Sequence, residues 1–201
     1  MSLAGIDARI ATTADAAGIS RTLSAALNAD PVWSWAFPDA RRRPAQLEAW
    51  WRLYIDGALR YPWVWTTPAH ETSAVWIPPG GTELSAAQES LVEPLLADLV
   101  GTRSEVVMSA LERFEAAHPR DQPHYYLSLL GTHPDQRGRG LGMDLVAANL
   151  ARIDEEHMPA YLESSNPANN SRYQRAGFAP YGQFSVSDGG PVVTTMWRVA
   201  R

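Results

Sequence analysis

The sequence predicts one α/β domain over residues 1-201, with a mixed central sheet of six to seven strands flanked by helices. Three observations favour this class. Strand-like and helix-like patterns alternate along most of the chain. A length of 201 residues suits one domain, and we find no linker or internal repeat. Between His124 and Ile153, an apolar strand, a glycine-rich turn and an amphipathic helix follow one another.

The first part of the chain predicts a strand, two helices and a hairpin. Asp15 is a suitable N-cap for the first helix. The aromatic segment from Asp30 to Asp39 is bracketed by prolines, which predicts irregular structure. The regular elements are expected at 8–13 (strand), after Asp15 (helix), at 44–60 (helix), and at 63–67 and 72–77 (strands).

The region 81–122 predicts a helical insertion between the third and fourth strands. Helical periodicity covers 85–100 and 104–117, with Pro94 interrupting the first stretch and Gly101 separating the two. After the central turn, the pattern predicts one short helix and three strands. These elements are expected at 160–164 (strand), 169–175 (helix), 178–186 (strand) and 192–199 (strand).

Composition excludes several kinds of chemistry. The chain contains no cysteine, so disulfides, thiolate metal sites and cysteine nucleophiles are excluded. It also contains no lysine, which excludes Schiff-base mechanisms through that residue. We expect no metal.

Charge and hydropathy limit the expected partners and location. A formal net charge of −5 disfavours nucleic acid, because a phosphate backbone demands a basic face. No apolar run approaches ~18 residues, and the N-terminus lacks a signal-peptide pattern. We therefore expect a cytoplasmic protein with no membrane association, as a monomer or a homodimer.

The turn between the central strand and helix has the pattern of an anion site. Arg137, Gly138, Arg139, Gly140, Leu141 and Gly142 would place several backbone N–H groups in one concavity at a helix N-terminus. A Walker loop is excluded, because Met143-Asp144 stands where lysine and serine or threonine are required. The dinucleotide pattern G-x-G-x-x-G fails on spacing. A glycine-rich connection with no ligand is the plain alternative.

Two motifs in order resemble the GNAT family of N-acetyltransferases. Arg137, Gly140 and Gly142 fit its R/Q-x-x-G-x-G/A turn, and Asn169, Tyr173, Gly177 and Phe178 fit its N-x-x-x-Y-x-x-x-G-F pattern. The amino-acid sequence at 163–169 is similar to that of the branch of the family that contains puromycin N-acetyltransferase. The resemblance covers about 124–180 and implies a single GNAT-like domain. The insertion at 81–122 departs from small family members, which have a short turn there.

The resemblance implies acetyl-coenzyme A as cosubstrate and assigns its binding residues. The main chain of Leu130, Gly131 and Thr132 would hold the pantetheine arm and acetyl carbonyl. The turn from Arg137 to Gly142, with Gly138, Arg139, Gly140 and Leu141, would hold the pyrophosphate. Asn169 would bind the pantetheine arm.

Two catalytic residues follow from the same resemblance. Tyr173 would donate a proton to the departing thiolate; the structural alternative is an aromatic ring that packs a short helix onto the sheet. Glu163 would take the proton of the acceptor amine or attract it as an ammonium ion, provided that it faces the same side as Tyr161. The alternative for Glu163 is a cap on the following turn. His124 and His133 are assigned no catalytic role.

Trp33, Trp35 and Phe37 are candidates for a substrate pocket. The chain has eight tryptophans, most of them in its first half, and in the family the corresponding region lines the acceptor site. Core packing explains such rings equally well.

The sequence therefore predicts an acetyl-coenzyme A-dependent N-acetyltransferase that acts on a small-molecule amine. Direct transfer in a ternary complex is expected, because no cysteine is available for an acetyl-enzyme. The alternative is a non-catalytic acyl-coenzyme A sensor or partner-binding module, which would not need Tyr173 or Glu163. A serine hydrolase is excluded because the chain has no G-x-S-x-G motif.

Overall fold

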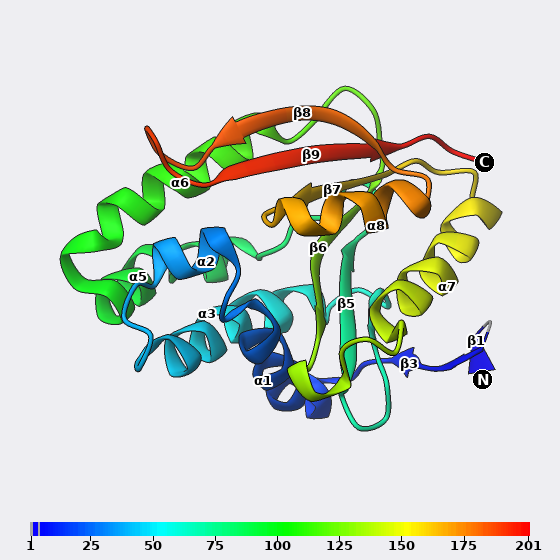
Figure 1. The fold of residues 1–201 in the computed structure, drawn as a ribbon, viewed down its shortest axis with the longest axis horizontal. Coiled ribbons are helices and arrows are strands. Elements are labelled where there is room, and N and C mark those ends of the chain that lie inside the picture. The colour runs from blue at the N-terminus through cyan, green and yellow to red at the C-terminus, as the bar shows by residue number, and fades with distance from the viewer. Residues whose placement is uncertain (1, 4) are drawn as a thin grey trace.

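A computed structural model describes residues 2, 3 and 5–201 and confirms the mixed α/β fold (Figure 1). The main sheet has seven strands in the order β3-β4-β5-β6-β7-β9-β8. Within it, β6 and β7 run parallel, and the other neighbours are antiparallel. A small ribbon of β1 and β2 precedes the sheet. The strands are β1 Ser2–Leu3, β2 Ile6–Asp7, β3 Arg9–Ile10, β4 Val64–Thr66, β5 Thr72–Ile77, β6 Tyr125–Thr132, β7 Ala160–Ser164, β8 Ala179–Ser185 and β9 Val192–Arg198.

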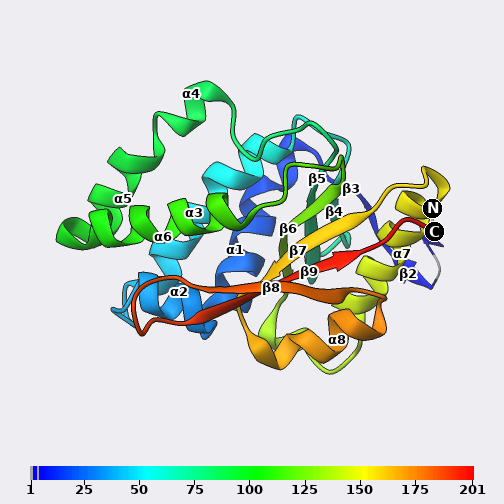
Figure 2. The ribbon, with the colours of Figure 1, turned by 90° about the horizontal axis from the view of Figure 1, so that it is seen from above.

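Helices cover both faces of the sheet, as Figure 2 shows. Helices α1 (Ala16–Leu27) and α3 (Arg43–Ala58) pack on one face, and α7 (Leu141–Glu155) packs on the other. The short α8 (Asn170–Arg175) follows β7. Each face has its own apolar core, which burial of large side chains stabilises. Among the helices in the described part of the chain, none is long and apolar enough to cross a bilayer.

Two elements of the first half differ from the prediction. The irregular segment after Asp30 contains a helix, α2 (Pro31–Ala36). The Asp30 carboxylate accepts from the backbone N–H groups of Val32 at 3.0 Å and Trp33 at 3.3 Å, so proline stands at a helix start. The strand expected at 8–13 is only Arg9–Ile10, because the following residues begin the capping turn of α1.

The insertion consists of α4 (Ala86–Glu89), α5 (Val92–Val100) and α6 (Ser104–Ala117). The break in its first half falls before α5, and Pro94 lies in the first turn of that helix, where a missing N–H costs little. The insertion packs on α2 and α3. Gln46 Nε2 donates to the carbonyl of Leu99 at 2.5 Å, and Arg103 Nη2 donates to that of Trp35 at 2.9 Å.

Strands β6 and β7 diverge toward the central turn. They pair only at the start of β6, where Tyr125, Tyr126 and Leu127 face Ala160, Tyr161 and Leu162. Beyond Leu127 the register with β5 shifts by one residue, which leaves Ser128 as the extra residue of a β-bulge. A bulge reverses the faces of a strand, so Leu127 and Leu129 lie in different cores. The gap between the strands leaves the backbone of β6 from 128 to 132 without a strand partner on the β7 side.

Candidate active site

The glycine-rich turn ends β6 and begins α7. Gly138 and Gly140 have φ of 81° and 82°, a conformation that side chains rarely adopt, and Gly140 is the N-cap of α7. A Cβ at Gly142 would lie 2.8 Å from Thr132 Oγ1, so the helix start and the strand end approach closely. The turn therefore needs glycine at Gly138 and Gly140 for its backbone conformation and at Gly142 for close packing against Thr132. Both are features of a turn whose backbone N–H groups bind an anion.

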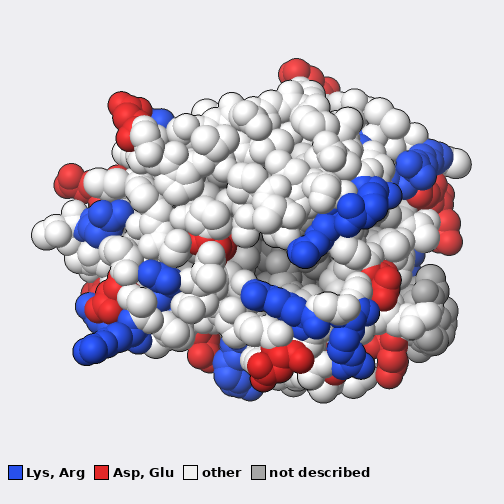
Figure 3. Space-filling model, viewed as in Figure 1, with Lys and Arg blue, Asp and Glu red and all other residues white. Residues whose placement is uncertain are grey.

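A cavity of about 810 Å³ lies over this turn, between α1, α7 and α8. Three arginines line it, with Asp30 as its single carboxylate. Figure 3 shows a hollow on this face with arginine side chains on both sides. Nine of the predicted coenzyme-binding residues line the cavity: Leu130, Gly131, Thr132, Arg137, Gly138, Gly140, Leu141, Gly142 and Asn169.

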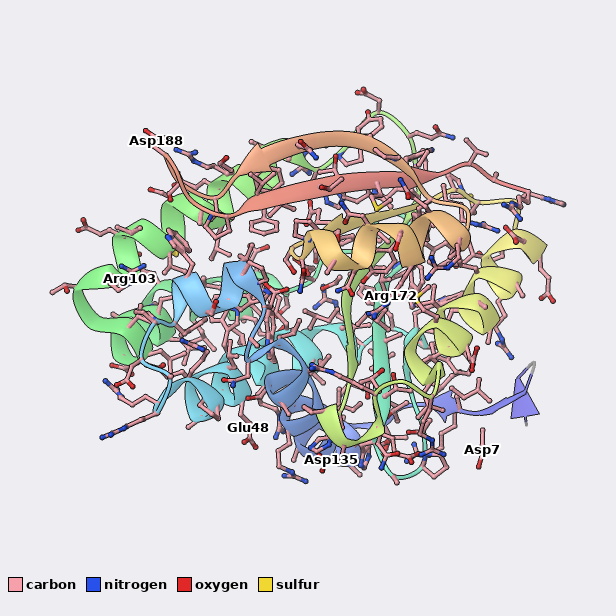
Figure 4. All side chains as sticks on the ribbon, in the orientation of Figure 1. Asp7, Glu48, Arg103, Asp135, Arg172 and Asp188 are labelled. Carbon is pink, nitrogen blue, oxygen red and sulfur yellow. The ribbon has the colours of Figure 1, made fainter. Side chains whose placement is uncertain are left out.

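Arg139 is the predicted coenzyme residue that does not line this cavity. Its guanidinium donates to Gln136 and lies 3.7 Å from the carboxylate of Glu71. Arg137 does line the cavity, and its Nη2 donates to the carbonyl of Ala26 at 2.7 Å, which ties the turn to α1. Arg172 of α8, labelled in Figure 4, is an arginine of the cavity that the sequence did not single out.

A second cavity of about 410 Å³ joins the first on the side of the insertion. Both cavities are lined by Leu27, Asp30, Leu130, Asn169 and Tyr173. Among the described residues that line the second cavity are six carboxylates and no arginine: Asp30, Glu83, Glu89, Glu112, Glu115 and Glu163. The two cavities thus have opposite electrostatic character, basic over the glycine turn and acidic beside the insertion.

Glu163 faces the acidic cavity from the end of β7. Its side chain is 4% exposed and lies on the same side as Tyr161. Tyr126 Oη donates to Oε2 at 2.7 Å, and Tyr161 Oη donates to Oε1 at 3.0 Å. Burial and the charge of Glu163 raise the pKa of both tyrosines, so both stay protonated donors.

Glu83, which the sequence did not identify, is another carboxylate of this cavity. The hydroxyl of Ser128, at the β-bulge, donates to it. Burial raises the pKa of Glu83 to about 7; the Ser128 hydrogen bond opposes that shift, and the charge of Glu163 adds to it. Glu83 belongs to the insertion, and sequence pattern alone does not show which way an insertion folds back.

His118 was also missed, for the same reason. It follows α6 and lines the acidic cavity, with Nδ1 at 3.8 Å from Glu163 Oε1. Its Nε2 lies 3.2 Å from Nε2 of His124. The sequence shows that His118 lies near the end of the insertion, and this position does not indicate which residues it contacts in the fold.

The three predicted pocket aromatics have different environments. Trp33 lines the acidic cavity, where its ring packs edge-on against Trp51 at a centroid distance of 4.6 Å. Trp35 does not line the cavity and lies under the guanidinium of Arg103. Phe37 is fully buried against Trp50. The pocket expectation therefore fits Trp33 and does not fit Trp35 or Phe37.

Tyr173 and Asn169 lie where the cavities meet. Burial, with the charge of Asp30 as a further cause, raises the pKa of Tyr173 to about 12. The ring packs near Phe178 at 6.3 Å. Asn169 Oδ1 accepts from Arg172 at 2.8 Å. Asp30 is 6% exposed, accepts from Ser165 Oγ at 2.7 Å and has a pKa raised by burial.

Comparison with known proteins decides the family. Residues 32–178 match the model of the Acetyltransferase (GNAT) family. The chain belongs to the GNAT family. This confirms the family expectation drawn from the two motifs, both of which lie in the matched region. The seven-stranded sheet, the flanking helices and the helical insertion agree with a GNAT-like domain.

Individual relatives place the chain within this GNAT family. Mycothiol acetyltransferase of Mycobacterium leprae (strain Br4923) is 31% identical over 163 residues, which is 69% of this chain and 49% of the relative. The chain thus spans about half the length of the curated relatives it matches.

Solved structures agree in fold. The structure described as histone acetyltransferase HPA2 and related acetyltransferase from Corynebacterium glutamicum superposes with a TM-score of 0.69 at 25% identity, covering 96% of both chains. Polyamine N-acetyltransferase of Drosophila melanogaster gives 0.59 at 15% identity, covering 96% of this chain and 98% of the other. At 15% identity the likeness shows the fold alone.

Proposed function

We propose that the protein is an N-acetyltransferase that moves an acetyl group from acetyl-coenzyme A to a small-molecule amine, by direct transfer in a ternary complex. The supporting observation is that a basic cavity and an acidic cavity meet at Asn169 and Tyr173. The first suits an anionic coenzyme, and the second suits a cationic acceptor. Acetyl transfer between the two substrates would take place where the two cavities meet.

The basic cavity fits acetyl-coenzyme A by its chemistry. Backbone N–H groups at the α7 N-terminus, together with Arg137, Arg172 and Arg175, suit the pyrophosphate and other phosphate oxygens. The β6 backbone from 128 to 132, which has no strand partner on the β7 side, suits the amides of the pantetheine arm, and Asn169 adds a side-chain amide. Bound there, the coenzyme would supply the acetyl thioester at the junction.

The acidic cavity supports an amine acceptor. Its six carboxylates lie beside the aromatic rings of Trp33, Trp51, Tyr54 and Tyr126. Carboxylates attract ammonium groups, and aromatic faces bind both cations and apolar bodies. Several of these residues come from the insertion, so the insertion is proposed to form one wall of the acceptor site.

Two side chains are proposed to act at the junction. Glu163, buried and fixed by two tyrosine hydroxyls, is proposed to act on the acceptor amine. Tyr173 is proposed to donate to the departing thiolate. Its pKa of about 12 lies ~3–4 units above that of a thiol, so full proton transfer is uphill by ~5 kcal/mol. That cost fits within an enzymatic barrier of ~16 kcal/mol.

Replacement of the Tyr173 hydroxyl tests this proposal. Tyr173→Phe should lower kcat roughly 100-fold, because a positioned proton donor contributes at least that much. Coenzyme affinity, measured by calorimetry, should stay within about twofold, since the ring remains. Thiol release with a panel of primary amines reports turnover. Tyr181→Phe is the matched control, because Tyr181 is 60% exposed and lines neither cavity.

The other outcomes separate the alternatives. If acetyl-coenzyme A raises the melting temperature and no amine releases thiol, the chain is a coenzyme-binding sensor. If Tyr173→Phe loses affinity and keeps turnover, Tyr173 serves packing. If the coenzyme neither binds nor stabilises the protein, the proposed function is wrong.

A further inference from the structure

His118 and His124 form a pair beside Glu163 that the proposed reaction does not yet use. The Nε2 atoms of the two rings are 3.2 Å apart. Both rings pack edge-on against Tyr161, at centroid distances of 4.9 and 5.6 Å. The pair joins the end of the insertion to the start of β6, and it faces the acidic cavity through His118.

Hydrogen bonding determines which nitrogens carry protons. His124 Nδ1 lies 2.7 Å from the carbonyl oxygen of Gln122. A carbonyl only accepts, so this nitrogen carries the hydrogen, and in the neutral ring Nε2 is bare. Burial lowers the pKa of His124, which favours the neutral ring. The 3.2 Å contact then needs a hydrogen on Nε2 of His118, so Nδ1 of a neutral His118 is the bare nitrogen.

The bare nitrogen of His118 points toward a second acceptor. Its distance to Glu163 Oε1 is 3.8 Å, longer than a hydrogen bond. Both oxygens of Glu163 already accept from tyrosine hydroxyls, and both tyrosines keep their protons. Two acceptors at this separation are within reach of one ammonium nitrogen that donates to each. The titratable groups around His118 are Glu163, Glu83, His124, Tyr126 and Tyr161.

We propose that the primary ammonium group of the acceptor binds between Glu163 Oε1 and His118 Nδ1, and that His118 is the base that removes its proton. His124 is a positioning residue that fixes the tautomer of His118. Glu163 supplies the negative charge that attracts the ammonium and then stabilises the imidazolium. This inference rests on the proposed acetyltransferase function and divides the work between the two groups.

The reaction balances with these residues. An ammonium N–H bond breaks, and the proton moves to His118 Nδ1, which frees the nitrogen lone pair. That lone pair forms the bond to the acetyl carbon while the carbon–sulfur bond breaks, and the thiolate takes a proton from Tyr173. The amide nitrogen loses its remaining extra proton to solvent, and solvent returns one proton to the Tyr173 phenolate. The side chain of His118 is 22% exposed, so it can release its own proton to water.

Nitrogen NMR of the free protein tests the tautomer without any substrate. With five histidines in the chain, selective ¹⁵N-histidine labelling and the variants His118→Gln and His124→Gln assign the two rings. We expect a bare Nδ1 on His118 and a protonated Nδ1 on His124. Addition of 2-phenylethylamine should shift the His118 signals, and its neutral analogue 2-phenylethanol should not. A protonated Nδ1 on neutral His118 would overturn the proposal.

Kinetics with matched variants test the role of His118 as base. His118→Gln keeps a donor toward His124 and removes the bare nitrogen, so kcat/KM at neutral pH should fall about 100-fold. The difference in kcat/KM between the wild type and His118→Gln should shrink as pH rises, because more of the amine is then already neutral. His124→Gln keeps an acceptor for His118 and should stay within about threefold of wild type. His124→Phe removes that acceptor, and its kcat/KM should fall further than that of His124→Gln.

The outcomes distinguish this inference from the proposed function. Turnover by the wild type, with a His118→Gln deficit that is constant across pH, would assign His118 a structural role and overturn the inference. Equal loss in His124→Gln and His124→Phe would overturn the positioning role of His124. If the wild type acetylates no amine, the proposed function fails instead.

Discussion

At the scale of single residues, the charge of the Glu83 carboxylate lowers the stability of the folded protein. Its carboxylate is partly buried among Tyr54, Ser128 and Glu163, and its pKa is raised to about 7. An unfolded chain ionises this group near its ordinary value, so between about pH 4.5 and 7 the folded state holds more protons. Stability therefore falls as pH rises through that window.

Glu83→Gln should remove this cost. The gain in free energy of unfolding should reach about 3 kcal/mol above about pH 8 and vanish near pH 4. Denaturant unfolding of the wild type and the variant at both pH values measures it. Glu89→Gln makes the same chemical change at an exposed position of the insertion and should change little. A gain that is independent of pH would contradict the account.

The positions of individual residues were predictable where a motif set them. Asn169 and Tyr173 reach the junction because the turn and the short helix are fixed by local pattern. Trp33 and Phe37 were indistinguishable in sequence, since both are aromatic residues of the same segment bracketed by prolines. The structure separates them because one side of this short helix faces the cavity and the residue that ends it enters the core.

At the scale of elements, the glycine turn is the best-defined feature. Gly140→Ala would force a side chain into φ of 82°, at a cost of about 1–2 kcal/mol. The new Cβ would lie 3.3 Å from Asp144 Oδ2, and the N–H groups of the α7 start would shift. We expect acetyl-coenzyme A affinity to fall at least about tenfold, by calorimetry.

A second glycine provides the control for backbone strain. Gly80 has φ of 74°, and its added Cβ would meet nothing within 4 Å. Gly80→Ala should therefore lose about the same stability and leave coenzyme affinity unchanged. Equal loss of affinity in both variants would mean that the α7 turn acts only through stability.

Most elements followed from periodicity, and the exceptions have local causes. The strand at 160–164 and the helices of the insertion were predicted closely. Helix α2 was missed because two prolines suggested irregular structure, whereas Asp30 caps a helix that begins at Pro31. The bulge at Ser128 left no sequence signal, because a serine inside an apolar strand fits ordinary alternation.

At the scale of the whole molecule, the fold brings two charge environments together. Helices α7 and α8 lie at one end and the insertion at the other, as Figures 1 and 2 show. The divergence of β6 and β7 opens the space between them. The sequence predicted the end with the glycine turn because motifs encode it locally. The acidic cavity depends on how the insertion packs, which involves contacts between distant segments.

The proposed direct transfer matches this layout, because the two cavities meet at Asn169 and Tyr173. Initial rates of thiol release, with acetyl-coenzyme A and the best amine of the panel both varied, test the central claim most directly. We predict release that requires both substrates, with double-reciprocal lines that intersect. Parallel lines would contradict direct transfer, and the absence of amine-dependent thiol release would contradict the acetyltransferase itself.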